Sequence, residues 1–337
     1  MSPLAALQLR AGLKNALRDF FGQRGYLEID TPVGVTCPGT EVHLGYFRTE
    51  WRDFRGEARA LHLRSSPELH MKQALALTKD GPGRLFQMGP CFRNDGELSP
   101  WHHPEFTMLE WYETGISFAA FVDQTEELLR ETHARLAPAV ARAGGTPLVL
   151  PRAFARFTVA EAFQQFARLT LIDGDPELAT QAREAGVISV RPDDDFETAF
   201  FKVLLEKVEP ALAAMSGAVL LDYPPSQAAL ASVNGGVAKR FEFYVGRVEL
   251  CNGFEELLDL ATNRARIRES LERRRLLGHE VPPEDEDFYA ALATGLAPCC
   301  GNALGFDRWL ALLMGDAELD HAVPFRWAKP YGPKPKS

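Results

Sequence analysis

The sequence predicts an α+β fold in which an antiparallel β-sheet is flanked by helices. Paired strand-like segments joined by polar loops dominate its informative regions, and alternating β–α–β units are not evident. Amphipathic helical segments precede and follow these strand pairs. No internal repeat or low-complexity linker divides the chain. We therefore expect one domain over residues 1–337, with a helical middle portion at about 116–215.

The first predicted element is a helix over residues 4–21, where apolar side chains recur at helical spacing. Gly22 and Gly25 end this helix, because glycine favours helix termination. The segment YLEID that follows reads as a short strand, and Pro32 stops it.

Residues 60–77 change their pattern at a Ser-Ser-Pro sequence. Apolar and polar residues alternate before Ser65 and take helical spacing after Pro67, so a strand is expected to lead into a helix. Ser66 is the expected N-cap, Pro67 the first helical residue and Glu68 a residue of the first turn. A well-formed helix start is the ordinary explanation of this sequence.

The remaining elements follow the same criteria. Two strands joined by a polar loop are expected at 85–92 and 104–112, and a long amphipathic helix at 118–143. A buried strand is expected at 218–224 and a hairpin that turns at Gly246 within 240–250. The arginine-rich segment 263–280 is expected to be an exposed helix with a solvated face. Residues 299–315 read as a glycine-bearing strand that leads into an apolar helix.

Composition narrows the possible partners. The 337 residues carry a net charge of -9, and an acidic chain without a basic tract is a poor candidate for a large RNA partner. No apolar run is long enough to span a membrane, and the charged N-terminus does not resemble a signal peptide. Five cysteines without a C-x-x-C pair favour structural thiols over a disulfide framework. We therefore expect a cytoplasmic protein that does not bind a membrane.

Three groups of residues place charge beside apolar strands, where the loss of hydration must be compensated. These groups are Arg93, Asn94 and Asp95 followed by His103 and Phe106; Glu249, Asn252 and Glu256; and Asp307 with Arg308. Together they suit a bent triphosphate, because guanidinium groups can hold phosphate oxygens bidentately. Paired carboxylates can hold Mg²⁺, and an aromatic ring can stack on adenine.

Simpler explanations exist for each group taken alone. A single arginine in a hairpin is usually a surface residue, and a glycine pair often marks only a tight turn. Zinc binding by His102 and His103 is a further alternative, but neighbouring residues of a strand point to opposite faces.

Five segments resemble the class II aminoacyl-tRNA synthetases of the lysyl type. Segments 25–32 (GYLEIDTP), 92–112 (FRND…HHPEFTMLEWY) and 303–308 (ALGFDR) are similar to the three motifs of that class, in order. SPELHMK and ELCNGFEEL are similar to further lysyl-type signatures. The matches span nearly the whole chain. The resemblance implies a class II catalytic fold, ATP and Mg²⁺ as cofactors, and a homodimer built around the first motif.

Within this family the chain resembles the paralogues that lack an anticodon-binding domain and act on elongation factor P. Its first motif begins within the opening 30 residues, and the chain ends 29 residues after Arg308 (337 − 308). Ala303 stands where lysyl-tRNA synthetases usually have glycine. The resemblance implies activation of (R)-β-lysine, and poorly of lysine, followed by transfer to a lysine ε-amine of elongation factor P. It argues against tRNA as a partner.

The resemblance also assigns roles to individual residues. Arg93 would contact the α-phosphate and Arg308 the γ-phosphate, and these two are the expected catalytic residues. Further ATP-binding residues would be Asn94, Asp95, His103, Phe106, Glu249, Leu250 and Gly305. Residues of the substrate pocket would be Ser66, Pro67, Glu68, Tyr112, Asn252, Glu256 and Ala303. Glu249 and Glu256 would hold Mg²⁺.

The loop after Arg93 departs from the family pattern. Asp95 stands where glutamate is usual, the loop is one residue longer, and His103 replaces asparagine. Trp101 stands near the position of an arginine that normally helps to bind phosphate. Two other functions therefore remain open. One is a free-standing synthetase paralogue that acts on tRNA or another amino acid, and the other is a non-catalytic regulatory paralogue.

Overall fold

The computed structural model describes residues 1–78, 81, 83–94 and 99–327. The chain folds into two compact units, which are described separately below. Unit 1 comprises Met1–Ser117, Glu127–Leu148 and the chain from Leu258 onward, and unit 2 comprises Phe118–Glu126 and Val149–Leu257. The expectation of a single domain over residues 1–337 stays a prediction.

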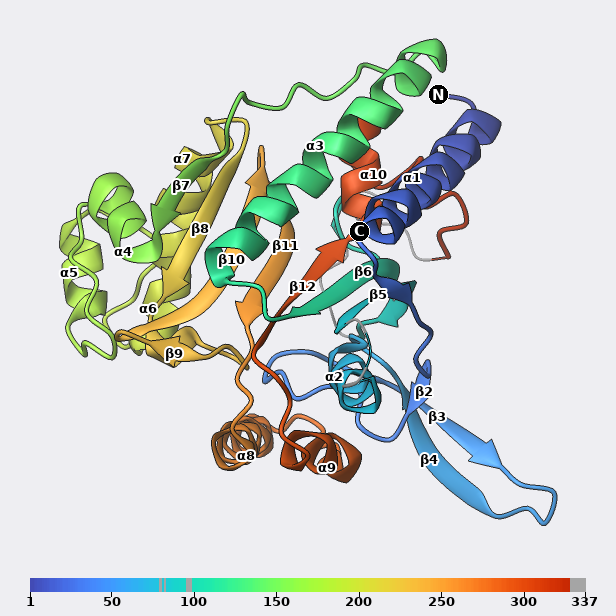
Figure 1. The fold of residues 1–337 in the computed structure, drawn as a ribbon. Coiled ribbons are helices and arrows are strands. Elements are labelled where there is room, and N and C mark those ends of the chain that lie inside the picture. The colour runs from blue at the N-terminus through green and yellow to red at the C-terminus, as the bar shows by residue number, and fades with distance from the viewer. Residues whose placement is uncertain (79–80, 82, 95–98, 328–337) are drawn as a thin grey trace, which may run out of the picture. The chain divides into compact units, whose positions relative to one another are not determined.

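Unit 1 contains a four-stranded sheet and a small second sheet (Figure 1). The four strands are β1 (Leu27–Glu28), β5 (Arg84–Phe92), β6 (Glu105–Thr114) and β12 (Cys299–Gly305), in that order across the sheet. The small sheet has the order β2 (Gly34–Val35), β4 (Ala58–Leu63) and β3 (Phe47–Arg52). All pairs are antiparallel except β1 with β5.

Unit 1 also contains helices. They are α1 (Pro3–Gln23), α2 (Glu68–Leu77), the part of α3 (Phe118–Arg142) that lies in unit 1, α8 (Leu260–Leu276), α9 (Glu286–Ala293) and α10 (Phe306–Met314). Figure 1 shows α1 and α10 on one side of β5 and β6, with α2 on the other. On the α1 side, Phe21 stacks on Phe86 of β5 with ring centroids 4.6 Å apart. The indole of Trp309 on α10 donates a hydrogen bond to Thr132 of α3 at 3.0 Å.

Unit 2 contains a second set of strands, in the order β11 (Val248–Glu255), β10 (Val237–Val245), β8 (Ala218–Tyr223) and β7 (Ala155–Thr158), with β9 (Val233–Asn234) paired to β10. Its short helices are α4 (Val159–Ala162), α5 (Leu178–Glu184), α6 (Phe196–Val203) and α7 (Glu209–Ala213). Two π-helical turns (η1, Phe163–Ala167; η2, Leu204–Val208) and a 3₁₀ turn (η3, Pro225–Gln227) complete it. Buried side chains from these helices pack on β8 and β10 and form its core.

The predicted fold class is confirmed: mostly antiparallel strands are flanked by helices, as expected of an α+β protein. Three details differ. The helical middle contains a strand, β7, which pairs with β8 in parallel, and β1 also pairs in parallel with β5. Strand β3 was not predicted, because its side chains are largely exposed and show no apolar alternation. Among the described residues, no helix is long and apolar enough to cross a membrane.

Candidate functional site

One face of β6 gathers side chains predicted to bind nucleotide and substrate. Alternate residues of a strand share a face, so Phe106, Met108, Glu110 and Tyr112 lie in one row. Small residues of β12 pair with this row: Gly305 with Met108, Ala303 with Glu110, and Gly301 with Tyr112. Their lack of bulk leaves room beside the β6 side chains. The register therefore places Ala303 next to a carboxylate, as a residue of a substrate pocket would be.

Glu110 is the most deeply buried carboxylate of this face, with 1% of its surface exposed. Its two oxygens accept hydrogen bonds from the Tyr112 hydroxyl at 2.7 Å and the Ser66 hydroxyl at 2.9 Å. Burial, followed by the nearby charge of Glu68, raises the pKa of Glu110 to about 8. A carboxyl group held in this way would ionise fully when a cationic ligand approaches. Glu110 was not predicted as a site residue from the sequence. A single carboxylate within the apolar run TMLEWY could have indicated one, because a buried charge needs compensating partners.

Ser66 and Glu68 lie at the start of α2, but the predicted N-cap was wrong. Helix α2 begins at Glu68, its N-cap is Pro67, and none of the described side chains caps it. The Ser66 hydroxyl accepts the Glu68 N–H at 3.0 Å while it donates to Glu110, since a hydroxyl can do both. Glu68 pairs at 2.7 Å with Lys72, whose side chain is fully buried. Ser66, Glu68, Glu110 and Tyr112 thus form one hydrogen-bonded and charged cluster.

Arg93 follows the end of β5 and lies beside Phe106 of β6. Its backbone N–H donates to the Pro104 carbonyl at 2.9 Å, and its guanidinium carbon is 5.2 Å from the centroid of the Phe106 ring. The Arg93 Nε is buried and has no hydrogen-bond partner within the described part of the chain. This donor suits a phosphate oxygen, which is a better acceptor than a neutral group. Asn94 pairs with Gly45 through its backbone, and Asp95 lies outside the described residues.

Arg308 lies in the first turn of α10, and Gly305 is the N-cap of that helix. The Arg308 guanidinium donates to Nε2 of His102 at 2.7 Å and to the Trp101 carbonyl at 3.3 Å. His103 instead donates from Nδ1 to the Glu105 carbonyl at 2.5 Å. The two neighbouring histidines thus have different partners. Arg93 thus lies beside Phe106, while Arg308 contacts Trp101 and His102 of the β5–β6 loop.

A buried clamp fixes the helix that carries Arg308. Asp307 accepts hydrogen bonds from Arg10 of α1 at 2.5 Å and from the Thr107 N–H of β6 at 2.6 Å. Arg10 also donates to the Thr107 hydroxyl at 2.6 Å. Burial raises the pKa of Asp307, and Arg10 opposes that rise. This network ties α1, β6 and α10 together beside the nucleotide residues, and no role had been predicted for Arg10.

The predicted residues of unit 2 lie on β11 and at its end. Glu249 and Asn252 are three residues apart, and a regular strand would turn them to opposite faces. The register shows an extra residue, because Tyr244 pairs with Glu249 whereas Phe243 pairs with Cys251. Leu250 is therefore a β-bulge, which returns both side chains to the same face. Glu256 follows β11 and forms a bridge with Ala231.

Negative charge accumulates on this face of unit 2. Glu242 pairs with Asn252 across the ladder, forms an ion pair with Arg240, and accepts the Tyr244 hydroxyl at 2.6 Å. Burial and then the charges of Glu242 and Glu249 raise the pKa of Glu209 to about 7. A divalent cation would offset this excess charge, so the donor chemistry around Glu249 fits Mg²⁺. Among the described residues, no group of three or more His, Cys, Asp or Glu side chains forms a metal site.

Known proteins resemble the chain over nearly its whole length. The model of class II tRNA synthetases (D, K and N) matches residues 3–328. The elongation factor P–(R)-β-lysine ligase of Vibrio cholerae is 35% identical over 328 residues, which cover 96% of this chain and 95% of that protein. The protein of the same name from Vibrio vulnificus is 36% identical, covering 95% and 94%, and that from Proteus mirabilis is 32% identical, covering 96% and 95%.

Proposed function

Since the chain belongs to the family of class II tRNA synthetases (D, K and N), we propose that it activates (R)-β-lysine with ATP and transfers the acyl group to elongation factor P. The resemblance inferred from the motifs is confirmed, and so is a ligase as the type of enzyme. The observation that carries the substrate proposal is the hydrogen-bonded cluster of Glu110, Glu68, Ser66 and Tyr112. These carboxylates suit an amino acid with a second ammonium group.

In the proposed first step, a carboxylate oxygen of the amino acid attacks the α-phosphorus of ATP, and pyrophosphate leaves. Arg93 would stabilise negative charge at the α-phosphate, Arg308 would hold the γ-phosphate, and Phe106 would stack on adenine. The nucleotide-binding site would also be lined by Asn94, Asp95, His103 and Gly305. Catalysis would depend on orientation and electrostatics, and orientation alone can supply roughly 7–11 kcal/mol of a barrier.

In the proposed second step, the ε-amine of a lysine on elongation factor P attacks the acyl carbon, and AMP leaves. An amide bond forms while the acyl–phosphate bond breaks. Pro67, Asn252, Glu256 and Ala303 would complete the substrate pocket, and Ala303 would favour a β-amino over an α-amino group. Activation of lysine itself would be weak.

Glu249 and Glu256 would hold Mg²⁺, with Leu250 contributing to the nucleotide side of β11. Bound Mg²⁺ would offset the charge of the phosphates. The crowding of carboxylates around Glu209 and Glu249 supports this assignment. We further propose a homodimer, from the resemblance of residues 25–32 to the family's dimer motif. A substrate that acts in translation would place the enzyme in the cytoplasm, and tRNA is not part of the proposed reaction.

Exchange of pyrophosphate into ATP tests the activation step. Purified protein with Mg²⁺ should catalyse exchange that depends on (R)-β-lysine and, more weakly, on lysine. An absence of exchange with both amino acids would overturn the adenylation proposal. Charging of tRNA without modification of elongation factor P would favour a synthetase paralogue instead.

A further inference from the structure

The loop between β2 and β3 lies against the residues assigned to ATP and to the amino acid. At one end, the Asn94 N–H donates to the Gly45 carbonyl at 3.0 Å, next to Arg93. At the other end, the Ser65 hydroxyl donates to the Pro38 carbonyl at 2.7 Å, next to Ser66. Residues 39–44 therefore lie between two fixed points that both border the proposed pocket.

The carboxylate of Glu41 points into this region. A Cβ atom built on Gly39 would clash with Oε2 of Glu41 and would lie 2.6 Å from Oγ of Ser65. The absence of a side chain at Gly39 thus lets the Glu41 carboxylate lie against Ser65. The Tyr46 hydroxyl is a distant donor to the same oxygen, at 3.4 Å. The Glu41 carboxylate therefore lies near Ser65, the residue that precedes Ser66.

The electrostatic surroundings of Glu41 agree with this position. Burial raises the pKa of Glu41, the Arg93 guanidinium lowers it, and the charge of Glu68 raises it again. Glu41 thus lies within electrostatic reach of both the predicted phosphate ligand and the predicted ammonium ligand. Its side chain nevertheless keeps an exposed surface.

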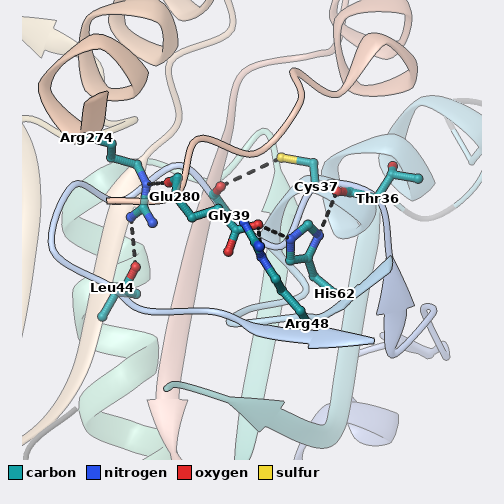
Figure 2. Close-up of polar contacts among 8 residues, drawn as sticks. All are labelled: Thr36, Cys37, Gly39, Leu44, Arg48, His62, Arg274 and Glu280. Atoms are coloured by element: carbon teal, nitrogen blue, oxygen red, sulfur yellow. Dashed lines mark hydrogen bonds and ion pairs between the residues drawn. The ribbon is translucent and has the colours of Figure 1, made fainter. Parts of the chain in front are cut away.

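Arg274 of α8 fixes the backbone of this loop. Its guanidinium donates to the carbonyls of Glu41 at 2.5 Å, Val42 at 3.2 Å and Leu44 at 2.8 Å, and to the Glu280 carbonyl at 2.6 Å. Figure 2 shows Arg274 between Leu44 and Glu280. Only 1% of the Arg274 surface is exposed, so the expectation that the arginine run forms a solvated face was wrong at this position. Burial of a guanidinium is tolerated here because carbonyl groups satisfy its donors.

A second set of contacts joins the segment after α8 to β3 and β4, and β4 to the loop. The Glu280 carboxylate pairs with His62 of β4 at 2.8 Å and with Arg48 of β3 at 2.6 Å (Figure 2). The other ring nitrogen of His62 lies 3.2 Å from the Thr36 carbonyl, at the beginning of the loop. The loop that carries Glu41 is thus held from both sides, which gives its carboxylate a fixed position.

We propose that Glu41 is a specificity-determining residue that binds the substrate's amino group nearest to the reacting carboxyl group. Arg93 marks where the α-phosphate and the substrate carboxyl group would meet, and Glu41 lies within electrostatic reach of Arg93 and of Glu68. The buried Glu110 would then take the distal ammonium. This inference rests on the proposed function, and it assigns Arg274 as the positioning residue of the loop.

The test compares two ligands that differ only in that amino group. 6-Aminohexanoate is (R)-β-lysine without its β-amino group. A change at a residue that binds the β-amino group should therefore alter the affinity for (R)-β-lysine and not the affinity for 6-aminohexanoate. Calorimetric titration of the full chain with each ligand, in the absence of ATP so that no adenylate forms, gives both Kd values. Glu41→Gln should weaken the binding of (R)-β-lysine about 10- to 100-fold, because the substitution removes a charge-assisted hydrogen bond. It should leave the Kd of 6-aminohexanoate unchanged.

The control is Glu50→Gln on β3. Glu50 is an exposed carboxylate that pairs with Arg52 at 2.6 Å, and the substitution should leave both Kd values unchanged. If Glu41→Gln and the wild type bind (R)-β-lysine with equal Kd values, the inference is overturned. It is also overturned if Glu41→Gln weakens the binding of both ligands equally. If the wild type binds (R)-β-lysine in the predicted way but catalyses no pyrophosphate exchange, the proposed function fails while the role of Glu41 stands. If the wild type does not bind (R)-β-lysine, both fail.

Discussion

Replacement of Arg274 by methionine removes the anchor of the Glu41 loop while keeping a side chain of similar length. The guanidinium donates to four backbone carbonyls, of Glu41, Val42, Leu44 and Glu280. Each charged hydrogen bond contributes about 1.5–3 kcal/mol, but burial of the guanidinium costs several kcal/mol and offsets part of the sum. Removal of one partner from such a buried network leaves the others unsatisfied. We expect Arg274→Met to lower the free energy of unfolding by about 3–5 kcal/mol.

Urea unfolding followed by circular dichroism measures this change. The matched control is Arg275→Met, one residue further along α8, because Arg275 is exposed and forms an ion pair with Glu272 one turn away on the same helix. We expect the control to change stability by less than about 0.5 kcal/mol. Arg274→Met should also weaken (R)-β-lysine binding as Glu41→Gln does. Equal stability of the two methionine variants would refute the reasoning, since it would mean that the buried guanidinium contributes no more than a surface arginine.

Three further predictions concern the proposed pocket and the nucleotide site. Because the pKa of Glu110 is raised to about 8, its carboxyl group is protonated below that pH, so affinity for (R)-β-lysine should increase as the pH rises towards 8 and then level off. Glu110→Gln should bind weakly at every pH, and a persisting pH dependence would assign the titration to another group. Arg308→Ala should lower the rate of pyrophosphate exchange by about 100-fold or more, and an unchanged rate would remove its phosphate role. Glu249→Gln should raise the Mg²⁺ concentration needed for half-maximal exchange, whereas an unchanged requirement would place the metal elsewhere.

The sequence predicted the elements whose patterns are local. The helix at residues 4–21, the strands at 85–92 and 104–112 and the hairpin at Gly246 agree with α1, β5, β6 and the β10–β11 turn. In each of these elements the apolar residues recur at a regular spacing, because one face of the helix or strand is buried. Strand β7 was not predicted, because its four residues lie inside a helical region and are too few to show an alternating pattern of apolar residues. Its parallel pairing with β8 forms only in the folded chain.

The site was predicted less completely, for reasons that concern tertiary contacts. Motif residues such as Arg93 and Arg308 were named as candidates from the resemblance to the family's motifs. Arg274 resembled its neighbours in an arginine run, and only its burial against loop carbonyls separates it from Arg275. Glu41 belongs to a loop without a motif, and its proximity to Arg93 and Glu68 depends on how that loop folds. The bulge at Leu250 likewise becomes visible only in the register of β10 with β11.

The measurement closest to the central proposal is the mass of purified elongation factor P after incubation with this protein, ATP, Mg²⁺ and (R)-β-lysine. We predict a mass increase of one β-lysyl group on a single lysine, lost when ATP or (R)-β-lysine is omitted and when Arg308→Ala replaces the wild type. Elongation factor P that stays unmodified, while the same preparation catalyses (R)-β-lysine-dependent pyrophosphate exchange, would contradict the assignment of its acceptor.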